Sequence, residues 1–202
     1  MNKGQLIEFF RHRFPDNVVD AFEKVPREKF VPENLRSLAY EDIAIPINEN
    51  ETISQPSTIA VMLSLLKLRD EHKVLEIGSG CGYVLALISE IIKDRGFVYG
   101  VEIASELYEL CRDNIENIQN AEIYNMNGKN GLPDKAPFNR ILISAALEEV
   151  PREILNQLKE NGIVVAPIGP RQMQTLTSIK RIGNDFVIVK EIPGFVFVPF
   201  IE

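Results

Sequence analysis

Residues 74–83 read Val74-Leu-Glu-Ile-Gly-Ser-Gly-Cys-Gly-Tyr83, a short apolar run that enters a loop with glycine at every second position. Residues 98–103 read Val98-Tyr-Gly-Val-Glu-Ile103, a second apolar run that closes with an acid. An amphipathic helical pattern lies between them, so the two runs predict a strand–helix–strand unit with a site for a nucleotide-type cofactor. The glycines let the backbone turn tightly and approach a ligand. Glu102, at the tip of the second strand, can accept hydrogen bonds from both hydroxyls of a ribose.

The spacing of the glycines narrows the choice of cofactor. Dinucleotide sites carry G-x-G-x-x-G, in which a helix N-terminus receives a pyrophosphate, whereas this loop has G-x-G-x-G. A P-loop is excluded as well, because no Lys-Ser/Thr pair follows the glycines. The loop is similar to the S-adenosylmethionine site of class I methyltransferases, in which it holds a methionine tail and no phosphate.

Composition sets further bounds on the protein. A chain of 202 residues can bury a sizeable core as one domain. Its net charge of −7 argues against nucleic acid as a partner, because neutralising phosphates requires clustered Lys and Arg. Cys81 and Cys111 have no metal-ligand spacing, which fits a reducing compartment. With no window of membrane-spanning length, we expect a cytoplasmic protein that binds no metal and no membrane.

The periodicity of the chain predicts an α/β fold. Apolar residues at helical spacing indicate two short helices before residue 25, and the basic residues there, Arg11, Arg13, Lys24 and Arg27, are interpreted as a solvated face. Residues 40–54 have no helical period and are expected to be an extended loop, and Pro56 is placed to begin a helix that runs to about residue 68. The following regular part predicts strands at 74–77, 97–101, 122–125, 140–144 and 163–167, and helices at 83–93, 105–118 and 152–159.

Alternating strands and helices imply a mostly parallel, twisted sheet with helices on both faces. Residues 176–182 and 186–192 alternate across Gly183-Asn184-Asp185 and predict a hairpin, and residues 195–200 predict a last strand. We therefore expect a Rossmann-like class I methyltransferase fold with antiparallel C-terminal strands and an N-terminal helical extension. Residues 1–202 are predicted to form one domain, in which 1–55 are a cap with a substrate-side loop and 56–202 are the cofactor-binding core.

A second set of motifs resembles one family. Val25-Pro-Arg-Glu-Lys-Phe-Val-Pro32, Ala39-Tyr-Glu-Asp42 and Thr52-Ile-Ser-Gln-Pro56 precede the glycine loop in that order. This arrangement resembles the protein-L-isoaspartate (D-aspartate) O-methyltransferase family, and the likeness runs from about residue 22 to the C-terminus. Later landmarks that fit the family are Ala136-Pro-Phe138, Ser144-Ala-Ala146, Glu149-Val-Pro151, Pro167-Ile-Gly-Pro170 and Phe197-Val-Pro199.

The resemblance implies an activity and a set of site residues. The enzyme would transfer a methyl group from S-adenosyl-L-methionine to the free carboxylate of L-isoaspartyl and D-aspartyl residues in damaged peptides and proteins, leaving S-adenosyl-L-homocysteine. Ser54 would stand at the catalytic position and orient the substrate carboxylate, and the protein would act as a monomer. The implied cofactor-binding residues are Glu76, Gly78, Ser79, Gly80, Gly82, Tyr83, Glu102, Ile103, Asn127 and Gly128, and the implied substrate-binding residues are Thr52, Ile53, Phe197, Val198 and Pro199.

The chain departs from the family pattern at several positions. Asn48 and Glu51 stand where Gly and Gln are usual, and Asn127 stands where an Asp usually accepts from the adenine amino group. Asn127 can still accept through its amide oxygen, but it carries no charge. Glu51 near an incoming carboxylate would repel it unless the side chain faces away or is paired.

These departures leave two other functions open. One is a methyltransferase of the same fold that acts on a different carboxylate or modified peptide. The other is an S-adenosylmethionine-binding module without catalysis, against which the intact Ser54 argues. Methyl transfer to an isoaspartyl peptide, compared with its aspartyl twin, discriminates among the three.

Overall fold

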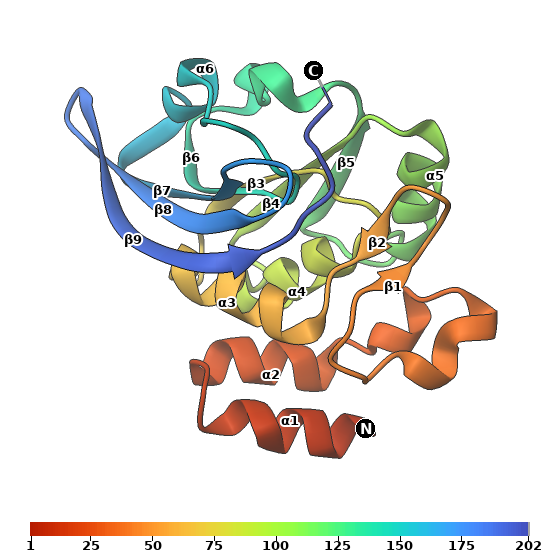
Figure 1. Cartoon of the computed structure of the whole chain (residues 1–202). Helices are drawn as coiled ribbons and strands as arrows, with labels where there is room; N and C mark the ends of the chain where they lie inside the picture. Colours follow the sequence, from red (N-terminus) through yellow and green to blue (C-terminus); the bar gives the residue numbers. More distant parts are fainter. Residues whose placement is uncertain (202) are drawn as a thin grey trace.

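A seven-stranded sheet runs through the centre of the computed structural model, which describes residues 1–201 (Figure 1). Its strand order is β5-β4-β3-β6-β7-β8-β9, in which the first five are parallel and the last two run antiparallel to their neighbours. The strands are β3 (Lys73–Ile77), β4 (Phe97–Glu102), β5 (Ala121–Asn125), β6 (Phe138–Ile143), β7 (Leu158–Ile168), β8 (Gln174–Ile182) and β9 (Asp185–Phe195). The predicted α/β class with antiparallel C-terminal strands is confirmed.

Alternate residues of the central strands point to two different cores. Val74 and Leu142 belong to a core shared with the helices, whereas their neighbours Leu75 and Ile143 belong to a second core on the opposite face. This period of two is the side-chain alternation of a strand, and both faces are apolar because both are covered. The helices are α1 (Lys3–Arg11), α2 (Asp16–Lys24), α3 (Pro56–Leu66), α4 (Tyr83–Ile92), α5 (Ser105–Asn114) and α6 (Arg152–Leu155).

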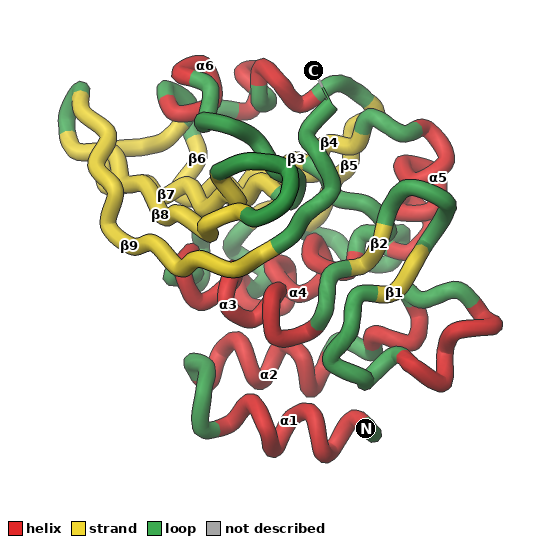
Figure 2. Tube along the Cα trace, viewed as in Figure 1, coloured by secondary structure: helices red, strands yellow, loops and turns green. Residues whose placement is uncertain are grey.

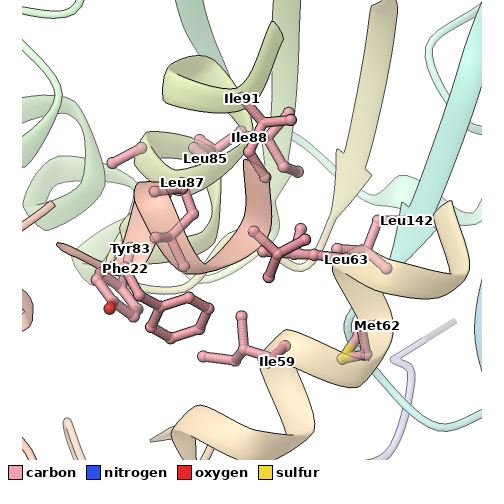
Figure 3. Close-up of a cluster of buried hydrophobic side chains, with 14 of the residues drawn as sticks. Phe22, Ile59, Met62, Leu63, Tyr83, Leu85, Leu87, Ile88, Ile91 and Leu142 are labelled. Atoms are coloured by element: carbon pink, nitrogen blue, oxygen red, sulfur yellow. The ribbon is translucent and has the colours of Figure 1, made fainter. Parts of the chain in front are cut away.

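The N-terminal helices extend the first core away from the sheet. Figures 1 and 2 show α1 and α2 stacked beyond α3 and α4. Aromatic edge-to-face contacts join these layers: Phe10 meets Phe22 at 5.1 Å between ring centroids, and Phe22 meets Tyr83 at 6.1 Å. Figure 3 shows Phe22 beside Tyr83, with Ile59 of α3 close by. Tyr83 begins α4 directly after the glycine loop. The stacked rings of Phe10, Phe22 and Tyr83 therefore hold the loop against the N-terminal helices.

Three local predictions were wrong. The helix expected at residues 152–159 ends at Leu155, because Leu158 already belongs to β7 and pairs there with Phe138 of β6. Arg181 donates a hydrogen bond to the Leu158 carbonyl at 2.7 Å. The extended loop expected at 40–54 contains a small ribbon, β1 (Ile45–Pro46) and β2 (Thr52–Ile53), paired antiparallel.

The last strand expected at 195–200 is absent from the described chain. β9 ends at Phe195, just after Gly194 takes a positive φ of 98°. The chain then leaves the sheet, and a bridge between Pro199 and Ala146 and a hydrogen bond from the Phe197 amide to Gln174 hold it. This C-terminal segment, residues 196–201, crosses the carboxyl ends of the parallel strands.

Gly82 combines a left-handed backbone conformation with a crowded environment. It caps α4 with a φ of 85°, and a Cβ there would lie 2.8 Å from Cys111 Sγ. Gly183, in the β8–β9 turn, has a φ of 62° but no heavy atom within 4 Å of such a Cβ. It therefore provides a control that carries the backbone strain alone.

We expect Gly82→Ala to lower the free energy of unfolding by roughly 2–5 kcal/mol, the sum of overpacking and left-handed strain. Gly183→Ala should lower it by about 1–2 kcal/mol, because only the strain applies. Chemical denaturation of both variants without cofactor measures the difference. Equal losses would contradict the packing constraint at Cys111.

Candidate active site

A cleft with a cavity volume of about 120 Å³, partly open to solvent, lies at the carboxyl ends of β3, β4 and β6. In an open parallel sheet this is the edge at which ligands bind. The β1–β2 ribbon and the C-terminal segment form its other walls. The sequence-predicted residues that line it are Thr52, Ile53, Ser54, Glu76, Gly78, Ser79, Gly80, Tyr83, Glu102, Ile103, Gly128, Val198 and Pro199.

The glycine loop forms the floor of the cleft, and β4 holds it in place. The Gly78 amide donates to the Val101 carbonyl at 2.8 Å, and the Gly80 amide donates to Glu102 Oε2 at 2.8 Å. Gly78 and Gly80 take positive φ values of 84° and 54°, which L side chains rarely adopt. The G-x-G spacing is thus required by the backbone itself.

Glu102 is fixed on both of its carboxylate oxygens. Oε2 accepts from Gly80, and Oε1 accepts from the Ala104 amide at 3.0 Å. The side chain is only 6% exposed, so it has one orientation, toward the cleft that it lines. A carboxylate can accept about four hydrogen bonds, so both oxygens keep capacity for hydroxyl groups of a ligand.

Glu76 is a buried acid with an unsatisfied oxygen. It is the next-to-last residue of β3 and is 1% exposed. Its Oε1 accepts from Ser144 Oγ at 3.0 Å, whereas Oε2 has no partner. Burial raises the pKa of Glu76 to about 8; the nearby charge of Glu102 adds to this, and the hydroxyls of Ser144 and Ser79 oppose it. Ser79 Oγ also lacks a partner. Two unsatisfied polar atoms on one wall of a cleft fit a ligand that brings a hydrogen-bond donor and a positive charge.

Ser54 faces these acids from the β2 end of the ribbon, just before α3. Its carbonyl accepts from the guanidinium Nη1 of Arg27 at 2.9 Å. Arg27 is fully buried, so its interpretation as part of a solvated face was wrong. Arg11 and Lys24 are exposed as expected. No signal along the chain marks Arg27 as buried, because Glu28 and Lys29 follow it directly.

Three predicted residues do not line the cleft. The Asn127 side chain accepts from the Lys129 amide at 2.9 Å and caps a short turn, so its role toward adenine stays a prediction. Gly82 supports the loop from the helix side, as described above. Phe197 is buried, and its amide donates to Gln174 Oε1 at 2.8 Å. Sequence reasoning missed Ser144, although it directly follows β6 beside the end of β3.

This sheet order, with a glycine loop after β3 and an acid at the tip of β4, defines the class I S-adenosylmethionine-dependent methyltransferases. Within that class, the sequence profile of protein-L-isoaspartate(D-aspartate) O-methyltransferase matches residues 1–202. The chain belongs to this family. Among described residues, no helix combines the length and apolar character needed to cross a membrane.

Individual relatives and structures agree with the family. The chain is 40% identical over its whole length to the protein-L-isoaspartate O-methyltransferase of Methanothrix thermoacetophila, covering 95% of that protein. It is 35% identical over 91% of its length to that of Thermosipho melanesiensis, covering 96% of it. A solved protein-L-isoaspartate O-methyltransferase superposes with a TM-score of 0.90 at 29% identity, over 98% of this chain and 65% of that one.

A second solved structure shows the shared fold at lower identity. It is described as a putative protein-L-isoaspartate O-methyltransferase from Plasmodium falciparum in complex with S-adenosyl-L-homocysteine. It superposes with a TM-score of 0.85 at 22% identity, over 99% of this chain and 98% of that one.

Glu76 makes stability depend on pH in a defined window. Below about pH 4.5 the carboxyl is protonated in both the folded and the unfolded chain, whereas up to about pH 8 only the folded chain keeps the proton. Each pH unit in this window therefore removes roughly 1.4 kcal/mol of stability.

We expect Glu76→Gln to remove this loss, so that the variant without cofactor is more stable than the parent at pH 8 but not at pH 4.5. Chemical denaturation across this range measures it, with Glu106→Gln, on the exposed first turn of α5, as the control. Parallel stability profiles of Glu76→Gln and the parent would contradict the raised pKa.

Proposed function

We propose that this protein transfers a methyl group from S-adenosyl-L-methionine to the free carboxylate of L-isoaspartyl residues, and of D-aspartyl residues, in damaged peptides and proteins. One observation carries the proposal: a single cleft unites the acids of the parallel-sheet edge with Ser54 of the opposite ribbon. Family membership supplies the substrate class.

The residues of the cleft fit the proposed cofactor. Glu76 and Ser79, which have unsatisfied oxygens, would receive the ammonium group of the methionine tail. Glu102 would accept the ribose hydroxyls, and the glycine loop would lie against the tail. Ile103 and Gly128 would border the adenine. Residue 128 is a glycine because a Cβ there would clash with Ile77 Cγ2. When bound, the cofactor supplies an electrophilic methyl group on a sulfonium.

Ser54 would orient the acceptor. A carboxylate is already ionised at neutral pH, so its attack on the methyl carbon needs no general base. The Ser54 hydroxyl would donate to one carboxylate oxygen and leave the other aligned with the methyl group. Alignment of this kind lowers a barrier by roughly 7–11 kcal/mol. Thr52, Ile53, Val198 and Pro199 would border the peptide. In the resulting methyl ester, a backbone amide nitrogen of the peptide attacks the ester carbonyl and methanol leaves, so the succinimide reforms.

The remaining parts of the proposal concern the whole chain. Residues 1–55 would act as a cap on a cofactor-binding core formed by 56–202, within a single domain. We propose that the protein acts as a monomer. A cytoplasmic location fits the two unpaired, buried cysteines, Cys81 and Cys111. The net charge of −7 supports protein substrates and argues against nucleic acid.

One observation favours a shifted substrate preference as a second candidate. Glu51 lines the cleft, and its side chain has no ion-pair partner among residues 1–201. A free carboxylate there would disfavour acidic peptides and favour those with basic residues beside the damaged position.

Labelled methyl transfer to an isoaspartyl peptide, and none to its aspartyl twin, is the expected result. Ser54→Ala should lower kcat roughly tenfold to a hundredfold, because it removes a hydrogen bond to a charged group. Calorimetry should find its affinity for S-adenosyl-L-homocysteine within about twofold of the parent, since Ser54 contacts only the acceptor. Ser57→Ala, outside the cleft, is the control. A parent inactive on both peptides would overturn the function, and an effect on cofactor affinity alone would overturn the role of Ser54.

We expect Glu51→Gln to lower the KM for an isoaspartyl peptide about two- to fivefold at low salt, as for a partly exposed charge pair. The difference should shrink at 0.5 M salt, since ions screen such charges. Glu49→Gln, exposed in the same ribbon and outside the cleft, is the matched control. If the KM of Glu51→Gln equals or exceeds that of the parent at low salt, repulsion by Glu51 is ruled out.

A further inference from the structure

Arg27 is a fully buried cation directly behind the proposed substrate site. It begins a short 3-10 turn, Arg27–Lys29, and has no exposed surface. Its Nη1 donates to the Ser54 carbonyl at 2.9 Å, and its Nη2 donates to the Ile43 carbonyl at 3.3 Å. Its Nε has no partner. The side chain thus connects the turn to the chain on either side of the β1–β2 ribbon.

No acid forms an ion pair with this charge within the described chain. Its guanidinium lies 5.6 Å from the ring centroid of Tyr83, and burial raises the pKa of that phenol, so the ring stays neutral. Asp42 is near enough to act on Arg27 by its charge, but its Oδ1 accepts from the Ser57 amide at 2.8 Å.

A buried charge without a counter-ion is strongly unfavourable, and an arginine cannot relieve the strain by losing its proton. Folding has nonetheless placed this one a single residue's length from the Ser54 hydroxyl. A substrate carboxylate that accepts from this hydroxyl therefore comes close to the guanidinium, with the Ser54 peptide between them. The charge of Arg27, which destabilises the protein without substrate, therefore attracts an anion that binds beside Ser54.

We propose that Arg27 is the positioning residue of Ser54 and the buried counter-charge of the substrate carboxylate. This inference rests on the function proposed above and deepens it. Two carbonyl contacts hold the ribbon so that Ser54 faces the cleft. The positive charge makes the cleft prefer an ionised carboxyl to a neutral group of the same shape, and it offsets the negative charge of Glu51 at the cleft wall.

Peptide binding separates this role from a merely structural one. The ligands are an isoaspartyl peptide and its twin in which the free carboxyl is a carboxamide. Calorimetry measures their binding to protein saturated with S-adenosyl-L-homocysteine. The variants are Arg27→Met, without the charge, and Arg27→Lys, with the charge but without the fork of donors. Arg36→Met, exposed in the next turn and paired only with Glu33, is the control.

The parent and Arg36→Met should bind the carboxylate peptide more tightly than the carboxamide. Arg27→Met should lose roughly tenfold to a hundredfold in affinity for the carboxylate peptide alone, as expected for a unit charge about 6–12 Å away at an effective dielectric constant of about 20. Its affinities for the carboxamide and for S-adenosyl-L-homocysteine should stay within about twofold. Arg27→Lys should keep the preference and lose kcat severalfold, because Ser54 is held less firmly.

Two results overturn the inference. One is that folded Arg27→Met keeps the parent's preference for the carboxylate peptide over the carboxamide peptide. If Arg27→Met does not fold, the corresponding result is that Arg27→Lys keeps the kcat of the parent. The other is an equal loss for both peptides, which identifies a structural role only. A parent that binds neither peptide and methylates neither overturns the proposed function instead, so the two failures are distinguishable.

Discussion

Two hydrogen bonds between neighbouring strand ends hold the whole site together. They run from Gly78 to the carbonyl of Val101 and from Gly80 to the carboxylate of Glu102. These bonds hold the chain after β3 across the tip of β4, so that it does not continue in the direction of the strand. The turn requires a left-handed backbone conformation at both glycines. α4 then begins with Tyr83 in contact with Phe22 and Phe30. The floor of the cleft, the position of α4 and the docking of the N-terminal helices follow from this crossing.

The cleft has unmatched charges of opposite sign on its two sides. On the sheet side, Glu76 is buried with an unsatisfied oxygen, and behind the ribbon Arg27 is buried without a counter-ion. Each disfavours the free protein, and each suits one partner of the proposed reaction, an ammonium group for Glu76 and a carboxylate for Arg27. The two unmatched charges thus destabilise the free protein, and the same charges make the cleft selective, because a ligand of the opposite charge removes the destabilisation when it binds.

Periodic segments could be predicted from the sequence, because burial imposes their pattern. The five parallel strands, the β8–β9 hairpin and helices α1 to α5 lie where alternation or helical spacing places them. The errors fall where local pattern and tertiary contact disagree. Residues 152–159 have a helical pattern, yet pairing with β6 draws Leu158 into a strand. Arg27 looks like a surface residue by composition, and only the long-range contact with Ser54 reveals its burial.

The candidate site divides in the same way. The glycines, Glu102 and Ser54 are local motifs whose roles depend on residue type and spacing, so the sequence locates them. The role of Ser144 depends on the ends of β3 and β6 lying side by side, where it donates to Glu76. The capping role of Asn127 depends on its side chain accepting from the Lys129 amide. Neither is encoded by spacing along the chain.

The C-terminal segment sets how the cleft can open. Two backbone hydrogen bonds with Ala146, to the Val198 carbonyl at 2.8 Å and from the Phe200 amide at 2.7 Å, hold it in place. By contrast, β3 and β4 are bonded to neighbours on both edges. Opening the segment exposes the cleft without breaking a ladder, whereas opening the strand side requires global unfolding. The amide hydrogens of Ala146 and Phe200, which donate these two bonds, should thus exchange with solvent water long before those of the central strands. We expect ligands to enter and leave the enzyme by this same low-energy opening.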